Sequence, residues 1–150
     1  MKQFSTLLLL IAVAAVSCTD NSSKQSGEVI SIAPEKIACY AGNSGKDTVT
    51  LSLATQDDRI TGELYYKFYE KDQTRGTLSG QWRGDTLVAD YIYTSEGMPS
   101  VRQVAFLQKG NTLIEGHGNM VEKNGKMVFA DTASLIFADG FLLQKIKCHL

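Results

Sequence analysis

Apolar and polar residues alternate in short runs from residue 48 onward. In the run 48–53 (TVTLSL), Val49, Leu51 and Leu53 share one side, and hydroxyl residues occupy the other. This period of two is typical of a strand with one buried face. Similar runs recur at short spacing, and the segments between them have the length of hairpin turns. The expected strands lie within residues 36–40, 48–53, 60–69, 76–82, 86–93, 101–108, 112–120, 127–131, 133–137 and 141–148.

These short connections determine the expected fold class. Because hairpin-length turns join antiparallel neighbours, we predict an all-β fold, an antiparallel meander of eight to ten strands. Closure into an up-and-down barrel removes the exposed sheet edges, so a closed barrel is the favoured architecture. A two-sheet β-sandwich is the alternative. The segment 132–146 fits either a strand or a short helix.

The N-terminus has the three parts of a secretory signal peptide. Lys2 precedes an apolar run from Leu7 to Val16, which is too short to span a bilayer as a helix. The run ends at the junction AVSC, which resembles the lipobox of bacterial lipoproteins. That resemblance implies that Cys18 receives a diacylglycerol, that the chain is cut before it, and that the new amine is acylated. The alternatives are an ordinary signal peptide with an incidental cysteine and a short N-terminal anchor.

Three regions follow from this interpretation. Residues 1–17 are expected to be a lipoprotein signal peptide, and residues 18–35 a flexible polar tether, because their composition cannot bury enough apolar surface to fold. Residues 36–150 are expected to form the β domain. The lipid would anchor the protein in the cell envelope, for which we favour the outer membrane.

Composition excludes one class of partner. The chain has 15 Lys and Arg against 16 Asp and Glu, without a basic cluster. Binding of nucleic acid is therefore not expected. The expected partners are the membrane, through the N-terminal lipid, an apolar small molecule and an envelope protein.

Two cysteines remain once Cys18 is assigned to lipid. Cys39 and Cys148 lie at opposite ends of the β domain and form an even pair. In an exported protein, such a pair predicts a disulfide, here joining the first and last strands. Two buried free thiols are the alternative.

Aromatic residues gather on the predicted inward faces of three consecutive strands. They are Tyr66, Phe68, Trp82, Tyr91 and Tyr93. They indicate either the packed core of a small barrel or the wall of an apolar ligand cavity. Gly76 and Gly80 share the face of Trp82, and their missing side chains favour empty space beside that ring. Tyr65, Tyr69 and Arg102 are predicted on the outer face.

The chain carries no recognisable catalytic constellation. Glu115 and His117 share one face of an expected strand, but Ile114 and Gly116 form the more apolar face. We therefore predict that Glu115 and His117 point outward into solvent. His149 is not tied to a site by any spacing. Without a phosphate-binding loop, a G-x-S-x-G motif or a Cys–His pair, we expect no enzyme activity, no cofactor and no metal site.

Two segments carry a resemblance to a known group. Residues 76–97 (GTLSGQWRGDTLVADYIYTSEG) and 101–118 (VRQVAFLQKGNTLIEGHG) resemble small envelope lipoproteins of Bacteroidota, over roughly residues 37–120. Their fold is similar to the calycin group of lipocalin-like barrels, which implies a barrel that holds a small ligand. The copper-resistance type of these lipoproteins carries a C-x-x-C motif near its start, and Cys39 lacks that partner.

Three Asp-Thr-apolar triplets match the glycosylation sites of exported Bacteroidota proteins. Their acceptors would be Thr48, Thr86 and Thr132. Taken together, the sequence predicts a lipid-anchored envelope lipoprotein whose barrel binds a small apolar ligand or lipid. The alternative is a structural or interaction protein of the envelope, with a solid core and no ligand.

Overall fold

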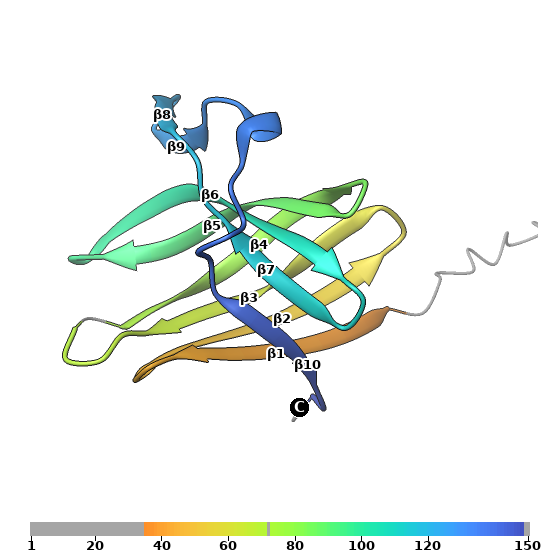
Figure 1. Cartoon of the computed structure of the whole chain (residues 1–150). Helices are drawn as coiled ribbons and strands as arrows, with labels where there is room; N and C mark the ends of the chain where they lie inside the picture. The colour runs from red at the N-terminus through yellow and green to blue at the C-terminus, as the bar shows by residue number, and fades with distance from the viewer. Residues whose placement is uncertain (1–34, 72, 149–150) are drawn as a thin grey trace, which may run out of the picture. The chain divides into compact units, whose positions relative to one another are not determined.

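The computed structural model describes residues 35–71 and 73–148, and these residues form ten strands and one 3-10 turn. Figure 1 shows their arrangement. The strands are β1 (Lys36–Ser44), β2 (Asp47–Gln56), β3 (Arg59–Lys67), β4 (Gln73–Arg83), β5 (Thr86–Ser95), β6 (Met98–Lys109), β7 (Thr112–Gly116), β8 (Met120–Lys123), β9 (Lys126–Phe129) and β10 (Leu142–Ile146), and the 3-10 turn is η1 (Thr132–Ser134).

Eight of these strands close into an antiparallel barrel. β1 to β7 pair with their sequence neighbours, β10 pairs with β7, and β10 then pairs with β1. The predicted up-and-down barrel is therefore confirmed, and the sandwich alternative is wrong. Closure satisfies the backbone groups that an open sheet would leave exposed at β1 and β10.

The alternating apolar residues of the strands fill the barrel. Val49, Leu51 and Leu53 of β2 are buried as predicted, and each lies opposite an inward residue of β1 or β3. The buried core is Tyr40, Val49, Leu51, Leu53, Ile60, Leu64, Tyr66, Leu78, Leu87, Ala89, Tyr91, Val104, Phe106, Leu113 and Leu143.

A hairpin outside the barrel forms a second, smaller core. β8 and β9 are joined at Asn124-Gly125, and both residues have the positive φ angles (54° and 74°) that this tight turn requires. β7 pairs only with the C-terminal part of β6, from Ala105 to Lys109. Nearer the start of β6, β9 lies beside it through a parallel bridge between Arg102 and Met127. The hairpin thereby covers part of the outer surface of the barrel. The buried residues are Val88, Ala105 and Phe129, with Met120 and Leu135 packed against them.

The segment 132–146, left open between strand and helix, contains both a short turn and a strand. Asp131 caps η1, because its carboxylate accepts hydrogen bonds from the Ala133 amide at 2.8 Å and from the Ser134 hydroxyl at 2.5 Å. The strand β10 begins only at Leu142. This strand is the one that closes the barrel.

The disulfide lies beside the closing strand pair. Cys39 of β1 is opposite Ile146 of β10, and Cys148 follows two residues later. The structure joins Cys39 and Cys148, whose Cα atoms are 5.3 Å apart, across 109 residues of sequence. The predicted pairing is confirmed, and it holds together the first and last strands of the barrel.

The barrel has two ends that differ in side chains. The Phe68 end contains the β1–β2, β3–β4 and β5–β6 turns, and lies at the left of Figure 1. The Trp82 end contains the β2–β3, β4–β5 and β6–β7 turns, together with Lys36, where β1 begins. No helix among the described residues is long and apolar enough to cross a membrane.

Candidate functional site

Four of the five predicted aromatic residues form one stacked group at the Phe68 end. The ring of Tyr66 stacks on Phe68 with centroids 5.7 Å apart, and meets Tyr91 edge-on at 6.0 Å. Tyr91 stacks on Tyr93 at 4.8 Å. A fifth ring, Phe141, extends the group from outside the predicted set, at 6.4 Å from Phe68.

Trp82 lies apart from this group. It points inward and packs against the core, but its partner in β5 is Leu87, beside the β4–β5 turn. Leu87 and Tyr93 are six residues apart in β5, which is about 20 Å along a strand. The five aromatic residues therefore do not form a single cavity wall, because Trp82 is at the opposite end of the barrel.

The space predicted beside Gly76 and Gly80 is filled by neighbouring atoms. A Cβ atom at Gly76 would overlap the carbonyl oxygen of Ile92 and lie 2.7 Å from the Tyr91 ring. A Cβ atom at Gly80 would lie 2.5 Å from the Cβ of Ala89. These glycines allow β4 to approach β5 closely, so they do not indicate a void around Trp82.

Polar side chains meet inside the barrel next to the aromatic group. The Tyr66 hydroxyl donates a hydrogen bond of 2.5 Å to Oε1 of Glu115, which is only 5% exposed. The Arg102 guanidinium lies over the Tyr66 ring, 5.8 Å from its centroid. Burial and the negative charge of Glu115 raise the pKa of the Tyr66 phenol, and the positive charge of Arg102 partly opposes them. We call Tyr66, Tyr91, Arg102 and Glu115 the internal polar cluster.

Two members of this cluster correct the sequence predictions. Glu115 lies opposite Phe106 and points inward with Leu113, so the predicted inward face of Ile114 and Gly116 is wrong. Arg102 lies opposite Tyr91 and also points inward, although it was predicted on the outer face. The outer side of Gly116 is covered by the Phe137 ring. An apolar face can therefore be buried outside the barrel as well as inside it, which is why the apolar pattern predicted the wrong inward face.

Two polar atoms of the cluster are buried without a hydrogen-bond partner. They are the Tyr91 hydroxyl and Nε of Arg102, which belong to directly opposite residues of β5 and β6. Burial raises the pKa of the Tyr91 phenol, and the neighbouring Thr74 hydroxyl and Arg102 charge partly offset this. Unsatisfied buried donors are rare in folded proteins, which makes them informative about ligands.

A cavity of about 450 Å³ lies at the Phe68 end. Phe68, Phe141 and Leu142 provide its apolar surface, and Asp47 and Asp139 provide carboxylates. The Asp47 carboxylate also accepts a hydrogen bond of 2.7 Å from the Tyr69 amide. We call this space the mouth cavity. Its volume lies in the range of small-molecule sites.

A smaller cavity of about 90 Å³ lies where β7 separates from β6. Arg102 and Glu115 line it from the internal polar cluster, and His117 and Phe129 line it from the segments that cover the barrel. We call this space the fork cavity. His117 itself is exposed, as predicted, and it pairs with Ile136 through the backbone.

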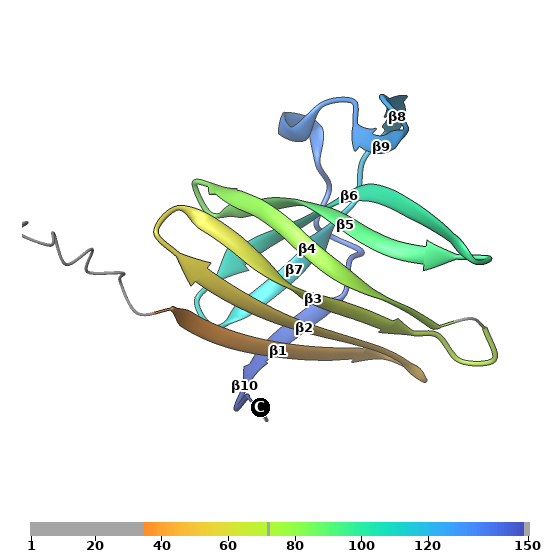
Figure 2. The same ribbon diagram turned by 180° about the vertical axis from the view of Figure 1, so that it is seen from behind.

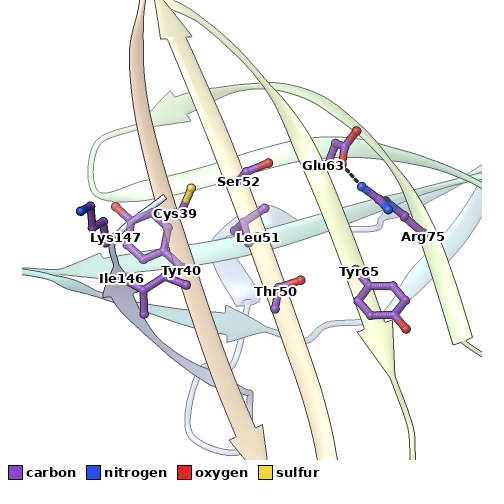
Figure 3. Close-up of a pocket in the computed structure, with 10 residues that line it drawn as sticks. All are labelled: Cys39, Tyr40, Thr50, Leu51, Ser52, Glu63, Tyr65, Arg75, Ile146 and Lys147. Carbon is purple, nitrogen blue, oxygen red and sulfur yellow. Dashed lines mark hydrogen bonds and ion pairs between the residues drawn. The ribbon is translucent and has the colours of Figure 1, made fainter. Parts of the chain in front are cut away.

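A third hollow, of about 350 Å³, lies on the outer surface of β1 to β4, the strands that face the viewer in Figure 2. Figure 3 shows Thr50, Ser52 and Tyr65 beside the ion pair between Arg75 and Glu63, which measures 2.6 Å. Both charged side chains are more than half exposed, so this pair contributes little to stability. Tyr65 and Tyr69 face outward, as predicted.

The remaining predicted sites fall in different parts of the chain. Thr48 lies in β2, Thr86 begins β5, and Thr132 begins η1, where its hydroxyl accepts a hydrogen bond from Arg83 at 3.5 Å. Cys18 and His149 lie outside the described residues. Within residues 35–71 and 73–148, no group of three or more His, Cys, Asp or Glu side chains is placed to hold a metal ion.

No family model, curated protein or solved structure was found to match this chain. The function is therefore argued from the residues and cavities described above.

Proposed function

We propose that this chain is a lipid-anchored envelope lipoprotein whose barrel binds a small, neutral, apolar molecule at the mouth cavity. The lipid anchor rests on the AVSC junction at Cys18 in the sequence. The binding role rests on one observation above all. A cavity of ligand size opens onto Phe68 and Phe141, whose rings continue into the aromatic group inside the barrel.

The charge of the mouth cavity restricts the ligand. Asp47 and Asp139 place two carboxylates on its wall, and none of the described residues that line it is cationic. An anionic head group would be repelled there, whereas a neutral apolar body would contact the two phenylalanine rings. We therefore expect neutral aromatic or lipid-like molecules rather than fatty acid anions.

A matched pair of fluorescent probes tests this proposal. The neutral probe is N-phenyl-1-naphthylamine, and 8-anilino-1-naphthalenesulfonate has the same rings with an added sulfonate. Each is titrated into the soluble domain begun after Ser26. The neutral probe is expected to bind saturably at one site and to raise the melting temperature, since it stabilises only the native state. The anionic probe is expected to bind at least about tenfold more weakly.

Variants locate the binding site. Phe68→Ala and Phe141→Ala each remove part of the apolar surface, and each should weaken the neutral probe about tenfold. Trp82→Phe is the matched control, because Trp82 packs at the opposite end of the barrel. A response that never saturates, or one equally weakened by Trp82→Phe, would contradict the proposal.

A second candidate function is supported by the filled barrel interior. The rings of Tyr91 and Phe106 are no more than 1% exposed, and the glycines of β4 face filled space. A solid barrel would act through its outer surface as an interaction protein of the envelope, with the hollow beside Tyr65 as the place of contact. Absence of saturable probe binding, together with loss of an envelope cross-link in Tyr65→Ala, would favour this alternative.

A further inference from the structure

The fork cavity brings two opposite charges to one small space. β7 leaves β6 after the pair Ala105–Gly116, and β9 joins β6 only at Arg102. The fork cavity occupies the wall between these two points, and Arg102 and Glu115 reach it from the barrel interior. Its volume of about 90 Å³ is sufficient for a small organic molecule.

These two charges are not paired with each other. Among the described residues, the ion pairs are Arg75–Glu63 and Lys126–Asp90, so Arg102 and Glu115 are not within ion-pair distance. Nε of Arg102 has no hydrogen-bond partner. The hydrogen bond from Tyr66 uses only Oε1 of Glu115. A donor of Arg102 and an acceptor of Glu115 are therefore left without a partner beside the same cavity, and leaving buried charged groups without partners is costly.

We infer that the fork cavity is a binding site for a small neutral molecule that carries an acceptor oxygen next to an N–H donor, as a primary amide does. The carbonyl oxygen accepts from the Arg102 guanidinium, which lines the cavity. The amide N–H donates to the free oxygen of Glu115. Because the two protein charges cancel, a ligand without net charge is favoured over either ion. This site is independent of the mouth cavity, so each proposal can fail without the other.

Acetamide, acetate and methylammonium test this chemistry directly. Acetamide offers both an acceptor and a donor, acetate only acceptors, and methylammonium only donors. The chain has four arginines, so nitrogen-15 NMR of the full mature protein in detergent micelles can resolve the Arg102 Nε–H signal. Acetamide should shift that signal saturably. Acetate and methylammonium should bind about 10- to 100-fold more weakly, which is the factor expected for loss of one charge-assisted hydrogen bond.

Changing Glu115 should reverse the preference. Glu115→Gln keeps the shape of the side chain but can present an N–H to the cavity, so acetate should then bind more tightly than acetamide. Arg102→Lys should abolish the acetamide response, which is followed in that variant through the His117 amide signal at the rim. Arg75→Lys is the control, because Arg75 lies on the outer surface. A thermal melt establishes that each variant is folded.

Three outcomes would overturn this inference. The first is an Arg102 Nε–H signal that responds to none of the three probes. The second is equal binding of all three, which indicates an unspecific, water-filled space. The third is a folded Glu115→Gln variant whose order of preference is unchanged.

Discussion

At the scale of single residues, the interior is defined by close packing and one buried polar pair. Tyr66 connects the two, because its ring stacks on Phe68 and its hydroxyl donates to Glu115. The sequence predicted Tyr66 as an inward aromatic residue but not its partner. A single glutamate is normally solvated, so residue type alone argues against burial. The available signal was the position of Glu115 two residues after Leu113 on the same face.

Gly76→Ala tests the packing of β4 against β5. An added Cβ would overlap the carbonyl oxygen of Ile92 and press on the Tyr91 ring. We expect a loss of about 1–3 kcal/mol in the free energy of unfolding, measured by urea denaturation. Thr77→Ala, on the exposed face of the same strand, is the control. An unchanged stability in Gly76→Ala would show that space exists beside this glycine.

Tyr66 should make the barrel sensitive to alkaline pH. Its phenol pKa is raised above the ordinary value of 10.0 by burial and by Glu115, so the folded state keeps the proton that the unfolded state loses. The stability from this group is complete below pH 10 and falls as pH rises above it, by up to about 1.4 kcal/mol per pH unit. Urea denaturation at pH 9 to 12 should give a shallower decline for Tyr66→Phe. Equal slopes in parent and variant would contradict this pKa direction.

At the scale of elements, strands with one covered face were predictable and strands with two covered faces were not. β2 to β4 alternate clearly, and their inward residues were predicted correctly. In β6, Val104, Ala105 and Phe106 are consecutive and all buried, because the β8–β9 hairpin covers the outer face. A period of two is lost in such a run, which explains why Arg102 was placed on the wrong face. The hairpin turn at Asn124-Gly125 could be predicted from the sequence. The position of the hairpin on the barrel could not, because it depends on contacts between residues that are far apart in the sequence.

The disulfide should stabilise the closing strand pair of β1 and β10. This pair extends only from Cys39 to Ala41 in β1, so few backbone hydrogen bonds hold it. In the chain-entropy model, a loop of this length contributes about 4–5 kcal/mol, which is an upper value. Labelling the denatured, unreduced domain should detect no free thiol at Cys39 or Cys148. Two labelled thiols per chain would contradict the pairing, and Cys39→Ser should lower the unfolding midpoint.

At the scale of the whole molecule, the two ends of the barrel differ. Lys36 begins β1 at the Trp82 end, whereas the mouth cavity lies at the Phe68 end. The ten residues of β2 span about 33 Å between these ends. The mouth cavity therefore opens at the barrel end opposite to the one where β1 begins.

Cys18→Ser tests the anchor. Without the thiol, the lipid cannot be attached and cleavage before residue 18 should not follow. We expect an unprocessed precursor that leaves the detergent phase on phase partitioning, measured by immunoblot and intact mass. Ser17→Ala, which keeps the cysteine and a small residue before it, is the control. A Cys18→Ser protein that is still cut and still partitions with detergent would exclude the lipoprotein interpretation.

The central claim is that the mouth cavity holds a neutral apolar molecule, and native mass spectrometry of the mature protein from its own envelope tests it most directly. We predict one adduct per chain, of small-molecule mass and beyond the covalent lipid, that is absent from a folded Phe68→Ala and Phe141→Ala double variant. A spectrum that contains only the lipidated chain would contradict the claim, as would an adduct retained in that double variant.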